Sequence, residues 1–387
     1  MADHNSRITS VAIPRPSIGP YVANSQRRAP SAAGAGGGWL EIWSDSALMR
    51  FEDNADPHMC GSLYPIAVDV REKSYTELEI KIQISSASLL NTRLELYGEN
   101  DTATKVIATV APEQSFPALG LHPVRVMVSP PWARQDIPWG LAGNITWKLR
   151  NLETGSLMGL NSSRLEIYAL TGTVPKFFRD RVPVELLRRV VLPRRTWTSS
   201  DTWERYCCLL VFQHFAFRYD VRGGVARYHV PKAGTFQLAR YLHDIGSRGV
   251  VNCYDQAAAM QIFLALSPTT PEVHWMFMEP FGFIRTTVLV GRGACNNPMY
   301  ERNGTAPVLG RTSPDRRCFG NHAFVRVGPA APDTKILDAC CGPHTGHENL
   351  DRYIQNSIDP RCRNVGLNGR ATDVAPVPDA VQRLLMA

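Results

Sequence analysis

The amino-acid sequence predicts an α+β protein in which an all-β sandwich precedes a domain built on a central helix against a mostly antiparallel sheet. Residues 39–172 alternate apolar and polar side chains with period two, which is typical of short sandwich strands. From residue 201 onward, helical repeats come first and strand-like runs follow. The length of 387 residues suits about two domains, and a content of 44% hydrophobic and 20% charged residues is globular.

The chain is expected to divide into four segments. Residues 1–38 are rich in Ala, Ser, Gly and Pro and are predicted to be a disordered leader. Residues 39–172 form the β-sandwich domain, and residues 173–200 form a connecting helix flanked by prolines. Residues 201–387 form the α+β domain, which carries the candidate functional residues.

The sandwich strands are predicted from apolar positions two residues apart. In "ELEIKIQI", residues 77–84, the side chains of Leu78, Ile80, Ile82 and Ile84 share one face. Similar runs follow at 93–98, 124–128, 144–149 and 163–170. No nucleophile–base pattern occurs there, so we expect this domain to be structural or to form one wall of a cleft, with partner binding as the alternative.

Charge and cysteine content restrict the partners and the compartment. The net charge is +7, but the basic stretch 175–195 follows an amphipathic pattern without a recognition module, so no nucleic-acid partner is predicted. The sequence shows no signal-peptide core and no segment long enough to span a bilayer. Nine cysteines without an export signal favour reduced thiols in a cytoplasmic protein with no membrane partner. The oligomeric state stays open.

The α+β domain is predicted from caps, turns and periodicity. Helices are expected over 201–220, capped by Asp201, over 235–246, and from 253 onward. Strands are expected over 273–278, 283–290, 322–327 and 335–339. The stretch 291–321 has no clear pattern, and a connection of that length is usually a functional loop or disordered.

Cys253 stands at the start of the third predicted helix. Asn252 is a plausible N-cap, and Asp255 completes a capping box. The following residues are apolar nearly all round, which indicates a buried helix. The helix dipole would stabilise a thiolate at Cys253. The alternative is that Cys253 is a small buried hydrophobe.

A base and its orienting group are predicted on a hairpin that follows. His322 opens one strand and Asp338 closes the next, and a hairpin centred on position 330 places them directly opposite, with Cβ atoms about 5 Å apart. Phe324 and Ile336 would then pair beside them. A buried carboxylate fixes the tautomer of an imidazole. Together with Cys253, these residues predict a Cys–His–Asp constellation.

The motifs "LARYLHDIGSRGVVNCYDQAAAM" and "NHAFVRV…KILDACCG" resemble the transglutaminase-like superfamily of papain-type thiol enzymes. The resemblance covers residues 201–345 and consists of a cysteine at the start of a buried helix, His-Ala-aromatic on a strand, and Asp on the next strand. Two features depart from the family pattern. Val251 and Asn252 replace the usual glycine, and Phe324 stands where tryptophan is more usual.

The resemblance implies acyl transfer through a thioester. Cys253 would attack an amide, ester or thioester carbonyl, His322 would move the proton, and Asp338 would orient His322. Gln237 is a candidate for the oxyanion donor that complements the Cys253 backbone N–H. The acyl donor would be a peptide, a protein or a carrier-bound thioester, and the acceptor an amine. Hydrolysis by a peptidase or amidase and a non-catalytic scaffold are the alternatives.

No metal or cofactor is predicted. Calcium dependence is not carried over from the animal transglutaminases, since no convincing acidic cluster is present. Cys340, Cys341, His344 and His347 crowd one turn, but adjacent cysteines are not the usual zinc spacing. We expect this turn to line the site below Asp338 instead.

Overall fold

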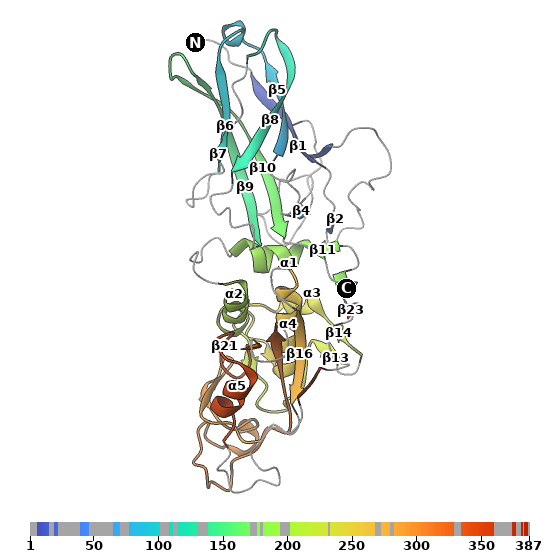
Figure 1. Cartoon of the computed structure of the whole chain (residues 1–387), viewed down its shortest axis with the longest axis vertical. Coiled ribbons are helices and arrows are strands. Elements are labelled where there is room, and N and C mark those ends of the chain that lie inside the picture. Colours follow the sequence, from blue (N-terminus) through green and yellow to red (C-terminus); the bar gives the residue numbers. More distant parts are fainter. Residues whose placement is uncertain are drawn as a thin grey trace. The chain divides into compact units, whose positions relative to one another are not determined.

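A computed structural model of the chain (Figure 1) describes the following residues: 6–14, 19–21, 39–45, 65–69, 77–100, 108–110, 115–129, 138–170, 176–178, 181–193, 202–230, 233–267, 272–278, 282–328, 334–359, 374–376, 381 and 383–385. The chain forms two compact units. One comprises residues 1–172 and 180–199, and the other comprises residues 173–179 and 200–387. The α+β character expected from the sequence is confirmed by the elements described below.

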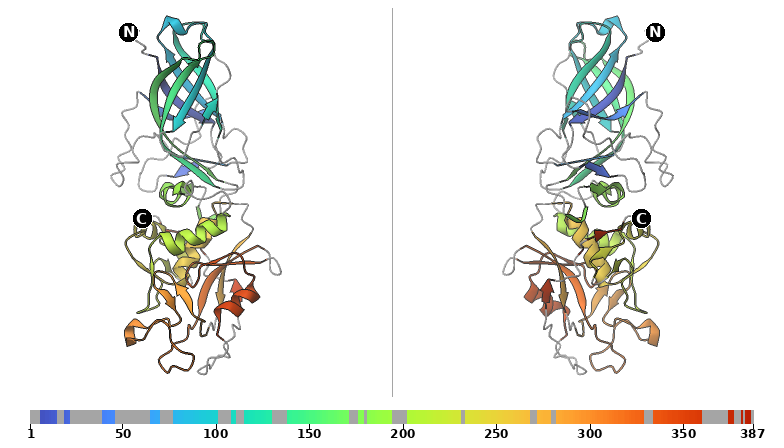
Figure 2. Two further views of the ribbon diagram at one scale, coloured as in Figure 1. Left: turned by 90° about the vertical axis from the view of Figure 1, so that its left-hand side faces the viewer. Right: turned by 90° about the vertical axis from the view of Figure 1, so that its right-hand side faces the viewer.

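The first unit is built on two larger β-sheets (Figure 2), which enclose one hydrophobic core. One sheet has the order β3 (Trp39–Ser44), β1 (Arg7–Pro14), β5 (Glu77–Ile84), β8 (Gly120–Ser129), β7 (Ala108–Val110). The other has the order β4 (Ile66–Asp69), β10 (Leu157–Leu170), β9 (Trp139–Asn151), β6 (Leu94–Asn100). The period-two prediction is confirmed in β5, where Leu78, Ile80, Ile82 and Ile84 are at most 2% exposed.

The prediction of a disordered leader is wrong for residues 7–14. These residues form β1, which pairs with β3 on one side and β5 on the other. A register shift between Ile8 and Ser10 turns both Ile8 and Val11 into the core, although they are three residues apart. The averaged composition of the segment concealed this short strand. The leader's remaining residues lie outside the described part, apart from Ser6 and the short strand β2 (Gly19–Tyr21), which pairs with β11 (Arg181–Pro183).

The predicted connecting helix exists and is part of the first unit. It comprises α1 (Val184–Leu186) and a π-helical turn, η4 (Leu187–Val191). Its apolar side chains are buried, and Arg188 Nε donates to Glu166 Oε1 of β10 at 2.8 Å. Helix and sheet are therefore packed together, and the segment is more than a linker. A short 3-10 turn, η3 (Lys176–Phe178), belongs to the second unit.

The second unit is built on a five-stranded antiparallel sheet with a buried helix against it, as predicted. The strand order is β21 (His344–Thr345), β20 (Lys335–Asp338), β19 (His322–Val327), β16 (Val273–Met278), β22 (Val374–Pro376). Helix α4 (Cys253–Leu264) packs on β19 and β16. The shorter elements around this core are α5 (Leu350–Ser357), β12 (Arg218–Tyr219), β13 (His229–Val230), β14 (Thr235–Phe236), β15 (Val250–Val251), β17 (Thr287–Leu289), β18 (Gly293–Cys295), η7 (Glu301–Asn303) and β23 (Arg383–Leu384).

Two predicted helices have different limits in the structure. The first is α2 (Trp203–Leu209), extended by a π-helical turn η6 (Leu210–His214), and its cap is Thr202, whose side chain accepts the Arg205 N–H. Asp201, the predicted cap, lies outside the described residues. The second is α3 (Leu238–His243), which starts later than predicted because Thr235 and Phe236 pair in a strand.

No helix in the described part of the chain is both long enough and apolar enough to cross a membrane. The described cysteines are all reduced thiols: Cys207, Cys208, Cys253, Cys295, Cys318, Cys340 and Cys341.

Candidate active site

The predicted capping box places Cys253 at the first position of α4. The Asn252 side chain accepts the backbone N–H groups of Tyr254 at 3.0 Å and Asp255 at 3.2 Å, and Asp255 Oδ2 accepts the Asn252 N–H at 3.2 Å. Cys253 is 4% exposed. As the first residue of α4, it lies at the positive end of a buried helix. This end of a helix dipole stabilises an anion.

Asp255 also fastens the start of α4 to a neighbouring segment. Its Oδ1 accepts the backbone N–H groups of Tyr228 and His229, both at 2.8 Å, and its Oδ2 accepts that of Arg227 at 2.9 Å. Burial raises the pKa of the Asp255 carboxyl to about 6, although these backbone donors act in the opposite direction. The position of Cys253 is therefore set by two chain segments.

His322 and Asp338 form a buried pair. Nε2 of His322 and Oδ2 of Asp338 are 2.7 Å apart, and both side chains are 1% exposed. The same Oδ2 accepts the Tyr353 hydroxyl at 2.9 Å, and Oδ1 accepts the backbone N–H groups of Cys340 at 2.8 Å and Cys341 at 3.0 Å. Burial raises the pKa of Asp338, but the charge and the hydrogen bond of His322 act in the opposite direction. Their combined effect is larger, and the pKa of Asp338 lies below its usual value. The carboxylate is ionised and held by four donors.

The hairpin that carries this pair is two residues out of the predicted register. Val325 pairs with Leu337, and Arg326 pairs with Ile336, so that the hairpin is centred one position later than expected. The turn sequence between the strands holds several turn-forming residues and does not fix its own centre. A shift of two residues leaves every side chain on its predicted face. His322 and Asp338 are therefore diagonal neighbours, and they still form their hydrogen bond.

The imidazole of His322 lies between Asp338 and the region of Cys253. Its Nε2 is bonded to Asp338, and the Cys253 thiol contributes to the pKa of the ring, which indicates that the sulfur lies nearby. Because Nε2 is engaged, Nδ1 is the nitrogen left to serve the sulfur. Burial lowers the pKa of His322, but the charges of Asp338 and Cys341 and the hydrogen bonds to Asp338 and Cys253 raise it well above its usual value. The ring is therefore held as a cation near the thiol at the start of α4.

Gln237 stands at the N-cap position of α3, where its amide oxygen accepts Arg240 Nη1 at 3.4 Å. Its role as an oxyanion donor stays a prediction. Sequence reasoning missed Tyr219, a buried phenol on β12 that interacts electrostatically with Cys253. Burial raises the pKa of Tyr219 well above its usual value, so the hydroxyl keeps its proton and remains a donor. The only signal for Tyr219 in the sequence was its position in the segment 217–220, "FRYD". We predicted that this segment belongs to the helix over 201–220.

Gln256, one turn into α4, ties the helix to the strand that bears Asp338. Its Nε2 donates to the carbonyl oxygen of Ala339 at 3.1 Å, and its Oε1 accepts the Tyr241 hydroxyl at 3.0 Å. This buried bridge fixes the separation between the helix start and the end of β20.

The turn after Asp338 contributes the backbone N–H groups of Cys340 and Cys341 to the site, and its two histidines contact other residues. His344 Nδ1 and Glu348 Oε2 are hydrogen-bonded, and His347 lies 3.4 Å from an Arg205 nitrogen. Burial raises the pKa of Cys340 well above its usual value, which keeps it a thiol.

One group in the described part of the chain has a geometry compatible with a metal ion: His322, Asp338 and Cys341, whose ligand atoms lie within 4.8 Å of one another. Each oxygen of Asp338 already accepts two donors, and Nε2 of His322 is taken up by the same carboxylate. The arrangement therefore suits a hydrogen-bonded network better than a ligand shell.

Comparison of this chain with models of known protein families found no match, and comparison with curated proteins found none either. What the site can do must therefore be argued from its chemistry.

Proposed function

We propose that this protein is a cysteine-dependent acyl transferase that passes an acyl group from an amide or thioester donor to an amine through a thioester at Cys253. One observation carries the proposal. A buried thiol at a helix start adjoins an imidazole whose far nitrogen is bonded to an ionised carboxylate. This is the geometry of an activated nucleophile with a base and an orienting group. The antiparallel sheet against a central helix also agrees with a transglutaminase-like domain, which we propose for residues 201–387.

In the first half of the reaction, the Cys253 thiolate attacks the carbonyl carbon of the donor. The carbonyl oxygen becomes an oxyanion, for which the Cys253 backbone N–H and the Tyr219 hydroxyl are the donors we propose. His322 gives its Nδ1 proton to the leaving amine or thiol, and the bond between the carbonyl carbon and the leaving group breaks. The product of this half is the thioester and a neutral imidazole.

In the second half, His322 Nδ1 takes a proton from the incoming amine as its nitrogen attacks the thioester carbonyl. The carbon–sulfur bond breaks, an amide forms, and the Cys253 thiolate and imidazolium are restored. Water in place of the amine gives hydrolysis with the same residues, so a peptidase or amidase is the alternative. Intact-mass spectrometry separates the two, because a trapped acyl-enzyme is discharged either by added amine or in buffer alone.

Alkylation kinetics test the nucleophile. Iodoacetamide should modify Cys253 at pH 7 at least about tenfold faster than the other described cysteines, since a stabilised thiolate is the reactive form. Cys253→Ala should abolish the fast phase. Cys295→Ser is the matched control, because it removes a buried thiol that bonds the Asn297 carbonyl oxygen and not the His322–Asp338 pair, and it should keep the fast phase. Slow and equal reaction of all thiols would overturn the proposal in favour of a non-catalytic scaffold.

A further inference from the structure

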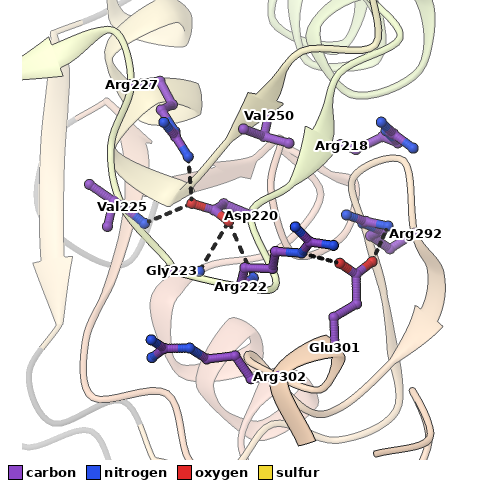
Figure 3. Close-up of a pocket in the computed structure, with 10 residues that line it drawn as sticks. All are labelled: Arg218, Asp220, Arg222, Gly223, Val225, Arg227, Val250, Arg292, Glu301 and Arg302. Atoms are coloured by element: carbon purple, nitrogen blue, oxygen red, sulfur yellow. Dashed lines mark hydrogen bonds and ion pairs between the residues drawn. The ribbon is translucent and has the colours of Figure 1, made fainter. Parts of the chain in front are cut away.

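An arginine-rich cavity of about 760 Å³ opens in the second unit (Figure 3). Its volume is in the range of small-molecule sites. Its lining includes the carboxylates of Asp220 and Glu301 and five arginines, which are Arg218, Arg222, Arg227, Arg292 and Arg302. Five positive and two negative charges leave the lining with a net charge of +3. A cavity with this excess attracts anions.

The two carboxylates are already engaged by three of the arginines. Glu301 pairs with Arg222 at 3.3 Å and with Arg292 at 2.8 Å, and Asp220 pairs with Arg227 at 3.5 Å. Figure 3 shows Arg222 and Arg227 directed toward these carboxylates. The pairs hold the walls of the cavity and neutralise only part of its charge.

The other two arginines carry two of the three excess positive charges. Among the described residues, no carboxylate pairs with Arg218 or Arg302. Arg218 Nη2 donates to the Arg248 carbonyl oxygen at 3.4 Å, but its Nε is buried and has no hydrogen-bond partner in the described part of the chain. A buried guanidinium N–H without an acceptor is costly unless a ligand supplies one.

The cavity wall is continuous with the segment that positions Cys253. Val250 lines the cavity and lies on β15, which pairs with β12 and leads directly to Asn252 and Cys253. Asn252 Nδ2 also donates to the Gly224 carbonyl oxygen at 3.1 Å, in the loop that borders the cavity. Tyr219, between two lining residues, interacts with Cys253. A ligand held here would contact β15, the strand that leads to the start of α4.

We propose that this cavity binds an anionic oxygen group, a carboxylate or a phosphate, carried by the substrate whose carbonyl Cys253 attacks. The inference rests on the proposed acyl transfer and adds a substrate class to it. Guanidinium groups recognise both kinds of anion through paired N–H donors. The anion would neutralise part of the excess positive charge to which Arg218 and Arg302 contribute.

Calorimetric titration of the full chain with inorganic phosphate and, separately, with succinate tests the site. Saturable binding is expected, and Arg218→Gln combined with Arg302→Gln should weaken it by about tenfold or more. The control is Arg352→Gln with Arg383→Gln, which removes the same charge from exposed positions outside the cavity and should leave binding unchanged. Arg302→Gln alone, at an exposed side chain, keeps the test valid if the double variant is unstable.

A second readout links the cavity to Cys253. The ratio of its alkylation rate by anionic iodoacetate to that by neutral iodoacetamide should fall several-fold in the double cavity variant and stay constant in the control. Binding of phosphate alone supports a phosphate-bearing substrate, and binding of succinate supports a carboxylate. Absence of saturable binding, or equal loss in the control variant, overturns the cavity proposal. Failure of the acyl-transfer proposal would appear separately, as slow iodoacetamide alkylation of Cys253.

Discussion

Substitution of Asp338 by asparagine would test how the carboxylate controls the imidazole. The variant keeps the size of the side chain and replaces one carboxylate oxygen by an amide NH₂. Oδ1 accepts two backbone N–H groups, from Cys340 and Cys341, and a backbone donor cannot become an acceptor. The amide oxygen is therefore fixed on that side, and the NH₂ must face His322 and Tyr353.

Both partners on the NH₂ side can accept a hydrogen bond from it, but His322 must lose its positive charge to do so. The Tyr353 hydroxyl can rotate to accept, and the His322 ring can become neutral and accept at Nε2. Its proton then lies on Nδ1 toward Cys253, which is the wrong tautomer for a base. The loss of the charge-assisted bond should lower the free energy of unfolding by about 1.5–3 kcal/mol, so the fold persists.

The expected kinetic effect follows from the thiolate population. In the proposed mechanism the Cys253 thiolate is paired with the His322 imidazolium, so the alkylation rate of Cys253 at pH 7 should fall by at least about tenfold when the imidazolium is lost. The proposed acyl transfer should fall by about 10⁴-fold, as for the same tautomer error in a serine protease.

The assay is the iodoacetamide rate of Cys253 between pH 5 and pH 10, with urea unfolding of the same samples. Tyr353→Phe is the matched control, because it removes one donor from Oδ2 and leaves the carboxylate charge in place. Its alkylation rate at pH 7 should stay within about tenfold of the unaltered protein. An Asp338→Asn variant that folds and is alkylated at the unaltered rate would refute the reasoning.

Three further outcomes are expected. Asp255→Asn should lower the free energy of unfolding in urea by about 2–4 kcal/mol, because the amide cannot accept all the backbone N–H groups of 227–229. An unchanged midpoint of urea unfolding would contradict this. Gly291→Ala should cost at least about 3 kcal/mol in thermal unfolding, because Gly291 has φ +64° and an added Cβ would lie 2.2 Å from the Phe217 carbonyl oxygen. Because the pKa of His322 is raised on folding, its charge stabilises the protein fully below about pH 6.5, and this stabilisation is lost as pH rises through the folded-state pKa. His322→Gln should therefore lower the urea midpoint most below about pH 6.5, and a difference that does not shrink at higher pH would count against the assignment.

The start of α4 could be predicted because its determinants are local. Asn252 and Asp255 are three residues apart, and both bonds of the capping box form within that span. The apolar residues that follow allow no solvent face, so burial of the helix also follows from the sequence. A helix start of this kind depends little on the rest of the chain.

The remaining parts of the site depend on contacts between distant segments. Tyr353 reaches Asp338 from α5, and nothing in its own sequence neighbourhood indicates that contact. Tyr219 joins the site because β12 pairs with β15, and two-residue strands leave almost no periodic signal. The cavity takes Arg292 and Glu301 from the long stretch after β17, which sequence patterns leave unassigned.

The two-residue difference in register explains what specifies this site. Strand parity alone placed His322 and Asp338 on one face, but it did not set their separation. The separation is set by the groups that hold Asp338: with two donors on each oxygen, the carboxylate cannot rotate without leaving a buried donor unsatisfied. Cys253 is held independently, through the Asn252–Asp255 box. The proposed contact between sulfur and imidazole therefore depends on two sets of hydrogen bonds, those of the capping box and those that hold Asp338. A substitution that weakens either set should lower the alkylation rate of Cys253 before it unfolds the domain.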